Sequence, residues 1–184
     1  MRRGPLAIAT IAAAVITACG TSQSTAPRSH TSPERDGLGR TREVQSGPLP
    51  NGEKVTLEDA KARTPYDLPV PPANDTTGEL TGIWIDGTQV AFVWTTDLTF
   101  YVGKSESGEA AAERGWRQKV EEQPEDGSEM TTARGHVAIG RDGHGDSSPS
   151  NLTWIENGLS LQFVASRHTL EQLRELADAI EIEG

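Results

Sequence analysis

The fold is decided by residues 80–101, which read LTGIWIDGTQVAFVWTTDLTFY. Runs rich in β-branched and aromatic residues flank Asp86-Gly87, a dipeptide typical of two-residue β-hairpin turns. If these two residues are the centre of a type I′ turn, Ile83 faces Val90 across the hairpin. The stretch therefore predicts two antiparallel strands in a defined register.

A third strand follows in the same stretch. Thr95-Thr96-Asp97 has the length of a three-residue connection, which sets Phe100 opposite Phe92 and continues the same apolar face. That face carries Ile83, Ile85, Val90, Phe92, Trp94, Leu98 and Phe100. The reverse face carries Leu80, Trp84, Ala91, Val93, Thr99 and Tyr101. This reverse face is unusually apolar for a side that antiparallel sheets commonly give to water.

A second hairpin is indicated further along the chain. Asn157-Gly158 is the strongest short hairpin signal, and it sets Trp154 opposite Leu161 and Leu152 opposite Phe163. Leu152, Trp154, Leu159, Leu161 and Phe163 share one predicted face, and Thr153, Ile155, Ser160, Gln162 and Val164 share the other.

Helices are expected at both ends of the globular part. Thr56 and Asp59 resemble a capping box for a short helix that Pro65 ends, and residues 68–72 must then be extended. Thr169 caps a last helix whose Leu173, Leu176, Ala177 and Ile180 recur at helical spacing and predict a core-facing stripe.

The middle of the chain carries weaker signals. Residues 107–114 favour a short helix stopped by Gly115, residues 116–121, 129–133 and 136–139 favour strands, and 141–150 favour a loop. Together these patterns predict one α+β domain over residues 54–184, an antiparallel sheet of hairpins with the N-terminal and C-terminal helices packed on one face.

The first nineteen residues have the pattern of an export signal. Met1-Arg2-Arg3 is a positive start, residues 4–15 carry no charge and are too short for a permanent membrane span, and Ile16-Thr17-Ala18-Cys19 follows. This last tetrapeptide resembles the lipobox of bacterial lipoproteins. The resemblance implies a signal peptide over 1–18, a diacylglyceryl group on Cys19 and a location on the outer face of the cell membrane. An ordinary secretory signal cleaved after Ala18 is the alternative, and Sec and Tat export both stay open.

Residues 19–53 are expected to be a disordered tether, because Ser, Thr, Pro, Gly and Arg dominate and few side chains can be buried. A partner-binding motif within the tether is the alternative. The chain has 17 Lys and Arg against 27 Asp and Glu, a net charge of −10. This balance argues against nucleic acid as a partner, because nucleic-acid binding needs a basic surface.

A family resemblance rests on three segments. The segments are residues 57–64 running into Leu68-Pro69-Val70-Pro71, the Trp154-Ile155-Glu156-Asn157-Gly158 hairpin, and the helix over 170–180. Together they resemble an extracytoplasmic domain of unknown function. That domain is found in Gram-positive membrane proteins, often beside anti-sigma-factor-like segments. The resemblance covers residues 57–182 and implies no catalytic residues. This chain departs from it by a lipid anchor in place of a membrane span.

Motifs for chemistry are sparse, so we expect no enzyme and no cofactor. Gly103-Lys104-Ser105 is the tail of a phosphate loop without its first glycine, and no string typical of a serine or zinc hydrolase occurs. Asp142, His144 and Asp146 alternate like the start of a calcium loop, but the later ligand positions are wrong, which favours a solvated turn and no metal. His136 and His168 are lone histidines, interpreted as surface residues or as hydrogen-bonded structural residues rather than catalytic ones.

The reverse face of the first sheet is the remaining candidate site. Trp84, Val93 and Tyr101 share it, and an exposed patch of this kind predicts binding to an envelope protein or a hydrophobic ligand. The competing interpretation is that residues 107–114 cover Trp84 and make it part of the core. Two functions follow: a membrane-anchored, non-enzymatic binding or sensing module, or a carrier or chaperone for a lipidic or peptide ligand.

Overall fold

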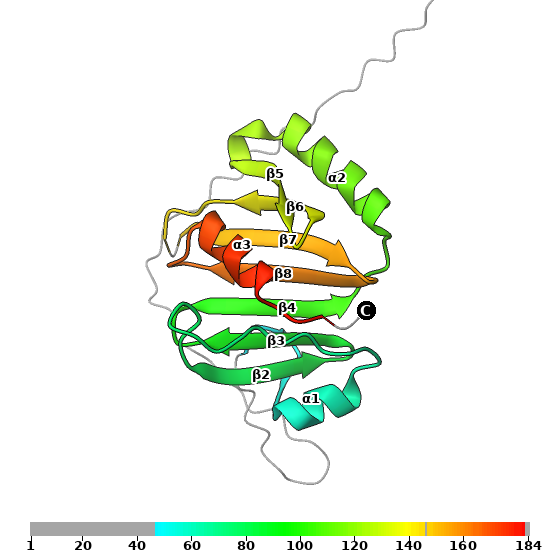
Figure 1. The fold of residues 1–184 in the computed structure, drawn as a ribbon, viewed down its shortest axis with the longest axis vertical. Coiled ribbons are helices and arrows are strands. Elements are labelled where there is room, and N and C mark those ends of the chain that lie inside the picture. Colours follow the sequence, from blue (N-terminus) through cyan, green and yellow to red (C-terminus); the bar gives the residue numbers. More distant parts are fainter. Residues whose placement is uncertain (1–46, 146, 183–184) are drawn as a thin grey trace, which may run out of the picture. The chain divides into compact units, whose positions relative to one another are not determined.

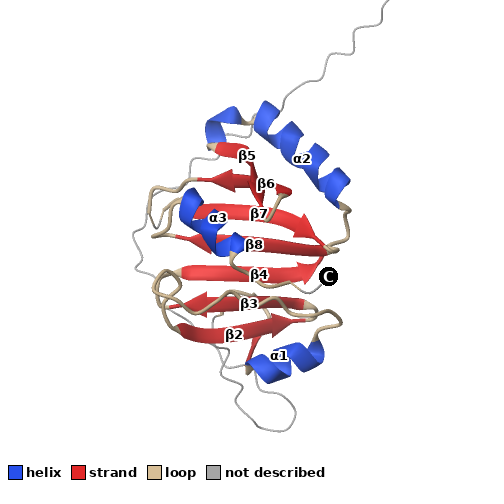
Figure 2. Ribbon diagram, in the orientation of Figure 1, coloured by secondary structure: helices blue, strands red, loops and turns tan. Residues whose placement is uncertain are grey.

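Strands dominate the fold, in the order β1-β2-β3-β4-β8-β7-β6-β5 within one antiparallel sheet (Figures 1 and 2). The computed structural model describes residues 47–145 and 147–182. The strands are β1 (Glu53–Val55), β2 (Leu80–Asp86), β3 (Gln89–Trp94), β4 (Leu98–Lys104), β5 (Ser128–Ala133), β6 (His136–Arg141), β7 (Ser150–Glu156) and β8 (Leu159–Ala165). The helices are α1 (Leu57–Arg63), α2 (Glu109–Glu122), the 3₁₀ turn η1 (Pro124–Asp126) and α3 (Leu170–Asp178). The predicted α+β class with an antiparallel sheet is confirmed.

The centre of the sheet joins strands that are distant in sequence. β2, β3 and β4 form one meander, and β5 to β8 form another. The two meet where β4 pairs with β8 along its whole length, from Leu98 opposite Ala165 to Lys104 opposite Leu159. This pairing makes the two predicted hairpin groups one sheet with one continuous apolar face.

The predicted turn of the first hairpin is wrong by one residue. Gly87 and Thr88, rather than Asp86 and Gly87, are its central residues, so Ile83 pairs with Phe92. Only Gly87 has a positive φ, +59°, which fits a type II′ turn. A type I′ turn at Asp86 would have placed a non-glycine residue in the left-handed region as well. Because the partner changes by two residues, the side chains keep their predicted faces.

The other two tight turns are confirmed. Phe92 pairs with Phe100 across a turn whose last residue, Asp97, has φ +57°. Trp154 pairs with Leu161 across Asn157-Gly158, whose φ angles of +51° and +75° are those of a type I′ turn.

The core lies on one face of the sheet, which we call the core face. Four aromatic rings follow one another across it: Phe92 lies 6.2 Å from Phe100, which lies 4.5 Å from Phe163, which lies 6.0 Å from Trp154. All four side chains are fully buried. Leu173, Leu176 and Ala177 of α3, and Ile180 two residues after its end, are buried in the same cluster, which confirms the predicted stripe.

The caps of the terminal helices are also confirmed. The Thr56 hydroxyl accepts a hydrogen bond from the Asp59 backbone N–H at the start of α1. At α3, Thr169 and Gln172 form a complete capping box. Leu68, in the extended segment after α1, is buried in the core cluster, and Val70 forms an isolated bridge with Glu181.

The middle helix differs from the prediction. α2 continues through Gly115 to Glu122, so the predicted strand over 116–121 is wrong. A β-carbon on Gly115 would meet nothing within 4 Å, which places this residue on the open side of the helix. Trp116 and Val120 lie one turn apart on the half-buried side, and the packing of α2 on β5, β6 and β7 outweighs the poor helix propensity of one exposed glycine.

We call the reverse side of the sheet its outer face. Val137 and Ile155 point to this face, because they alternate with the core residues Ala138 and Trp154. Both line a groove together with Trp116. α2 therefore packs on the outer face of β6 and β7.

Candidate functional site

The predicted patch residues lie together on the outer face of the first meander. Trp84 pairs with Ala91, which pairs with Tyr101, so the two aromatic side chains stand on either side of a small residue. Val93 lies in the neighbouring row, opposite Gly82 and Thr99. Trp84, Val93 and Tyr101 are each partly buried, and Ala91 has no exposed surface.

Trp84 is covered, although not by the segment that the sequence suggested. Residues 107–114 lead into and begin α2, which packs on β5 to β7 instead. The turn over residues 47–52 lies against Trp84: a β-carbon on Gly47 or Gly52 would touch its side chain. Leu49, 4% exposed, is buried outside the main core cluster. The Lys54 ammonium lies 5.3 Å from the centroid of the indole ring, within range of a cation–π interaction.

Trp84 contains a buried polar atom that makes no hydrogen bond within the described part of the chain. Its indole nitrogen is buried and has no hydrogen-bond partner among the described residues. An unpaired buried N–H costs roughly 1–3 kcal/mol. Trp84 is thus a packing residue for the 47–54 segment, and the accessible part of the patch shifts toward Val93 and Tyr101.

Between the 47–54 segment and α2, the outer face presents a strip without charged side chains. Its residues come from β3, β4 and β8 and are partly exposed: Val93, Thr99, Tyr101, Ser160, Gln162 and Val164. Burial raises the pKa of Tyr101 above its ordinary value, because desolvation disfavours the phenolate. The strip offers hydroxyl and amide groups around an aliphatic and aromatic centre, which suits binding rather than acid–base chemistry.

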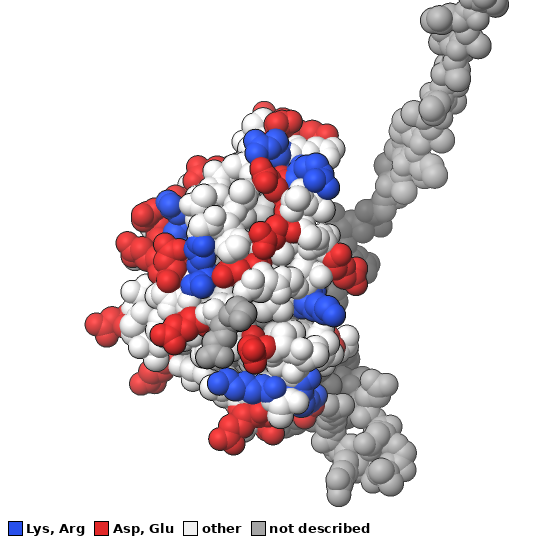
Figure 3. Space-filling model, turned by 45° about the vertical axis from the view of Figure 1, so that its right-hand side comes forward, with Lys and Arg blue, Asp and Glu red and all other residues white. Residues whose placement is uncertain are grey.

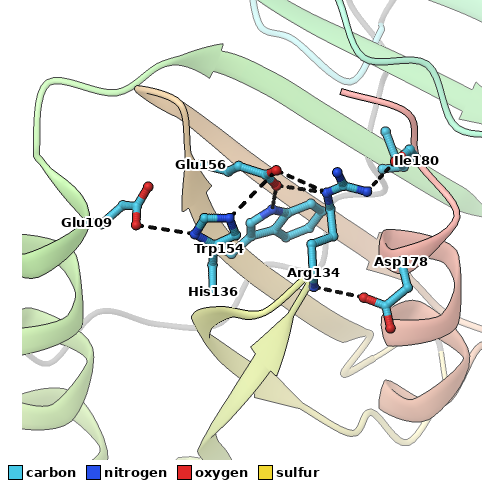
Figure 4. Close-up of polar contacts among 7 residues, drawn as sticks. All are labelled: Glu109, Arg134, His136, Trp154, Glu156, Asp178 and Ile180. Carbon is cyan, nitrogen blue, oxygen red and sulfur yellow. Dashed lines mark hydrogen bonds and ion pairs between the residues drawn. The ribbon is translucent and has the colours of Figure 1, made fainter. Parts of the chain in front are cut away.

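A second polar cluster lies at the rim of the sheet, where Arg134 and Glu156 meet (Figure 4). Glu156 is only 6% exposed, and its carboxylate accepts hydrogen bonds from Arg134 Nε at 2.9 and 3.2 Å and from the Trp154 indole N–H at 3.1 Å. Arg134 also donates through Nη1 to the Ile180 carbonyl and through its backbone N–H to Asp178 Oδ1. This cluster carries little signal in the sequence, where only Arg134-Gly135 indicates a hairpin turn.

His136 extends this rim cluster to α2. Its Nδ1 lies 3.2 Å from Glu109 Oε2, and its Nε2 lies 3.7 Å from Glu156 Oε1. Both oxygens of Glu156 accept hydrogen bonds from the Arg134 guanidinium. This carboxylate therefore connects β7 to the β5–β6 turn and, through Arg134, to the end of α3. The structural interpretation of His136 fits its place between two carboxylates.

His168 is buried as well, 8% exposed, and its Nε2 lies 2.8 Å from the Thr76 carbonyl. It lines a polar surface pocket with Thr76, Thr95, Thr96, Arg167 and Gln172. The side chain ties the loop before β2 to the start of α3.

The loop considered for calcium has another role. Asp142 Oδ1 accepts a hydrogen bond of 2.5 Å from the Leu170 backbone N–H, the first free donor of α3. The His144 backbone N–H donates to the Ser148 carbonyl, which closes the loop on itself. Asp146 and Cys19 lie outside the described residues. Within the described part of the chain no three His, Cys, Asp or Glu side chains are grouped for a metal ion.

Comparisons with known proteins give no match: no family model, no curated protein and no solved structure is similar to this chain. Among residues 47–145 and 147–182, no helix is both long and apolar enough to cross a membrane.

Proposed function

We propose that this chain is a lipid-anchored, non-enzymatic extracytoplasmic binding or sensing module of the bacterial cell envelope. The observation that supports it most is the uncharged strip around Val93 and Tyr101. In a chain with a net charge of −10, a sheet surface without charged side chains favours contact with another surface over solvation alone.

Anchoring through Cys19 is part of the proposal, on the strength of Ile16-Thr17-Ala18-Cys19 and the uncharged stretch before it. The lipid would hold the protein on the outer face of the cell membrane. Acyl chains contribute about 0.8 kcal/mol per buried methylene, so two or more chains give stable attachment.

The placement of α1 and α3 on the same face of the sheet also belongs to the proposal. Its support is that Ala60 of α1 and Leu173 of α3 are fully buried in one cluster with Phe92. Both helices would then cover the core face and leave the strip on the outer face to a partner.

The carrier hypothesis receives less support. It requires a cavity for an acyl chain or peptide between sheet and helices. Phe92, Phe100, Phe163 and Trp154 fill the core face with ring centroids 4.5–6.2 Å apart, the spacing of a packed aromatic core. A filled core favours recognition by the surface.

Site-specific photo-crosslinking in cells tests this function. A photoreactive residue at Tyr101 should give discrete adducts with an envelope component, and one at the exposed Arg114 of α2 should not. Val93→Glu places a charge in the strip and should abolish the Tyr101 adducts while the protein still melts cooperatively. Identical adducts from both positions, or adducts that survive Val93→Glu, would show that the strip is not the contact surface.

A further inference from the structure

α2 packs on β5, β6 and β7 without burying any of its own residues completely. None of its fourteen residues is buried, and Trp116 and Val120 are only partly so. A helix of this length in a globular domain normally buries an apolar stripe against its neighbours. Trp116 and Val120 therefore retain some apolar surface that residues 47–145 and 147–182 do not fully cover.

That surface lines a groove between α2 and the outer face, of about 270 Å³. Its walls are mainly apolar: Trp116 and Ala110 come from the helix, and Val137 and Ile155 come from β6 and β7. The volume lies near the lower end of the range for small-molecule sites and suits one long side chain better than a drug-sized ligand.

Two carboxylates give the groove a negative charge. Glu109 and Glu113 lie one turn apart on α2 and complete its lining. Their side chains are 52% and 38% exposed, so both are accessible to solvent. Acidic side chains also spread over much of the face that Figure 3 shows, with fewer basic ones between them. A cation is thus favoured both at the groove and on approach to it.

The present partners of these carboxylates are weak competitors. Glu113 pairs with Arg117 at 2.8 Å, but Arg117 is 58% exposed, and such i,i+4 surface pairs contribute only about 0.3–0.5 kcal/mol. Glu109 lies against His136 Nδ1 at 3.2 Å. An incoming ammonium group can displace Arg117 at low cost while its stem lies on apolar walls.

We propose that this groove binds a lysine side chain of a basic peptide or protein segment. The methylene stem lies along Val137 and Ile155, the ammonium group lies between Glu109 and Glu113, and Trp116 forms a wall for the cation. A lysine combines an apolar stem with a charged tip, which is the combination that this lining offers. This goes beyond the proposed function, because the site is separate from the strip around Tyr101.

The test is an NMR titration of the full chain with a capped alanine peptide that carries one central lysine, followed at the Trp116 indole N–H. We expect saturable shifts with a dissociation constant on the order of 0.1–1 mM. The same peptide with norleucine, which keeps the stem and lacks the ammonium group, should bind at least about tenfold more weakly.

Variants separate the groove from general charge attraction. Glu113→Gln should weaken lysine-peptide binding about three- to tenfold. Glu121→Gln is the matched control, because it removes the same charge from an exposed position of the same helix outside the groove. Ala110→Leu keeps a good helix former while filling the groove, and it should abolish the shifts without lowering the melting temperature.

Absence of saturable shifts, equal binding of the norleucine peptide, or equal losses in Glu113→Gln and Glu121→Gln would each overturn the proposal. The photo-crosslinks at Tyr101 do not depend on Glu113. Failure of the groove is therefore distinguishable from failure of the binding strip.

Discussion

At the scale of single residues, the polar groups that matter most are Glu156, which is buried, and Tyr66, which is half-buried. Glu156 accepts bonds from Arg134 and Trp154, and Tyr66 donates a 2.6 Å hydrogen bond to the Thr88 carbonyl. Buried polar groups stabilise a fold when they are satisfied and destabilise it when a partner is removed. Neither group was predictable from sequence, because both depend on contacts between distant segments.

Removing the Glu156 carboxylate is expected to be costly. Glu156→Ala leaves Arg134, whose side chain is 18% exposed, without its ionic partner, and we expect a loss of about 3 kcal/mol in the free energy of unfolding. Glu171→Ala is the control, since it breaks an exposed pair with Arg174 and should cost less than about 1 kcal/mol. Denaturant titration of both variants measures the difference, and similar losses would contradict the structural role of Glu156.

Tyr66 should make stability depend on pH in the alkaline range. Burial raises the pKa of Tyr66 to about 12 from an ordinary value of 10.0, so the folded state holds its proton where the unfolded state has lost it. This contribution is fully present below pH 10 and is lost as the pH rises toward about 12. Tyr66→Phe should show a smaller decline than the parent over this window. Parallel declines in melts of the two proteins would contradict a raised pKa of Tyr66 in the folded state.

Two aromatic residues on opposite faces provide a further comparison. Phe92→Ala empties the middle of the core and should cost about 3–5 kcal/mol. Trp84 is partly exposed and packs against the 47–54 segment, so Trp84→Ala should cost about 1–2 kcal/mol. Thermal melts rank the two variants. An equal loss of stability in the two variants would show that Trp84 contributes as much as a core residue.

At the scale of elements, the sequence predicts those turns and helix caps whose geometry depends only on neighbouring residues. The turn at Asn157-Gly158 and the caps at Thr56 and Thr169 form as expected, because their geometry needs only neighbouring residues. The first hairpin turn lies one residue later than predicted, because Gly87 suits both the second position of a type I′ turn and the first position of a type II′ turn. α2 was cut short at Gly115 because its extension depends on contacts with the sheet, which no local pattern records.

Glycine substitutions probe these elements directly. An added β-carbon meets nothing within 4 Å at either Gly115 or Gly158, so the two sites differ only in backbone conformation. Gly115→Ala in the middle of α2 should stabilise the protein by about 0.5–1 kcal/mol. Gly158→Ala should destabilise it by about 1–2 kcal/mol, because φ there is +75°. Destabilisation by Gly115→Ala would argue against a continuous α2.

At the scale of the whole molecule, the sequence predicted the two meanders but not how they join. Nothing local specifies that β4 pairs with β8, because that choice minimises exposed apolar surface over the entire sheet. The cover of Trp84 by residues 47–54 escaped prediction for a related reason: the segment was assigned to the tether on composition, and Leu49 alone gives no periodic signal.

The anchor is a prediction at this scale. Cys19→Ser should leave the protein uncleaved or mislocalised, because transfer of the diacylglyceryl group needs the thiol. Phase partitioning should then move the chain out of the detergent phase, whereas Ser22→Ala should partition like the parent. A Cys19→Ser variant that still enters the detergent phase would refute lipid attachment at this residue.

The pairing of β4 with β8 also has a consequence for how the chain folds. The two strands close a loop of about 55 residues, an entropic cost that local hairpins do not carry. Until β8 has been synthesised, β4 stays an unpaired sheet edge that is open to aggregation. The first meander is therefore expected to stay a nascent and exchange-labile hairpin pair until β8 is available to pair with β4. Folding then finishes in one late and cooperative step whose rate reflects this high contact order.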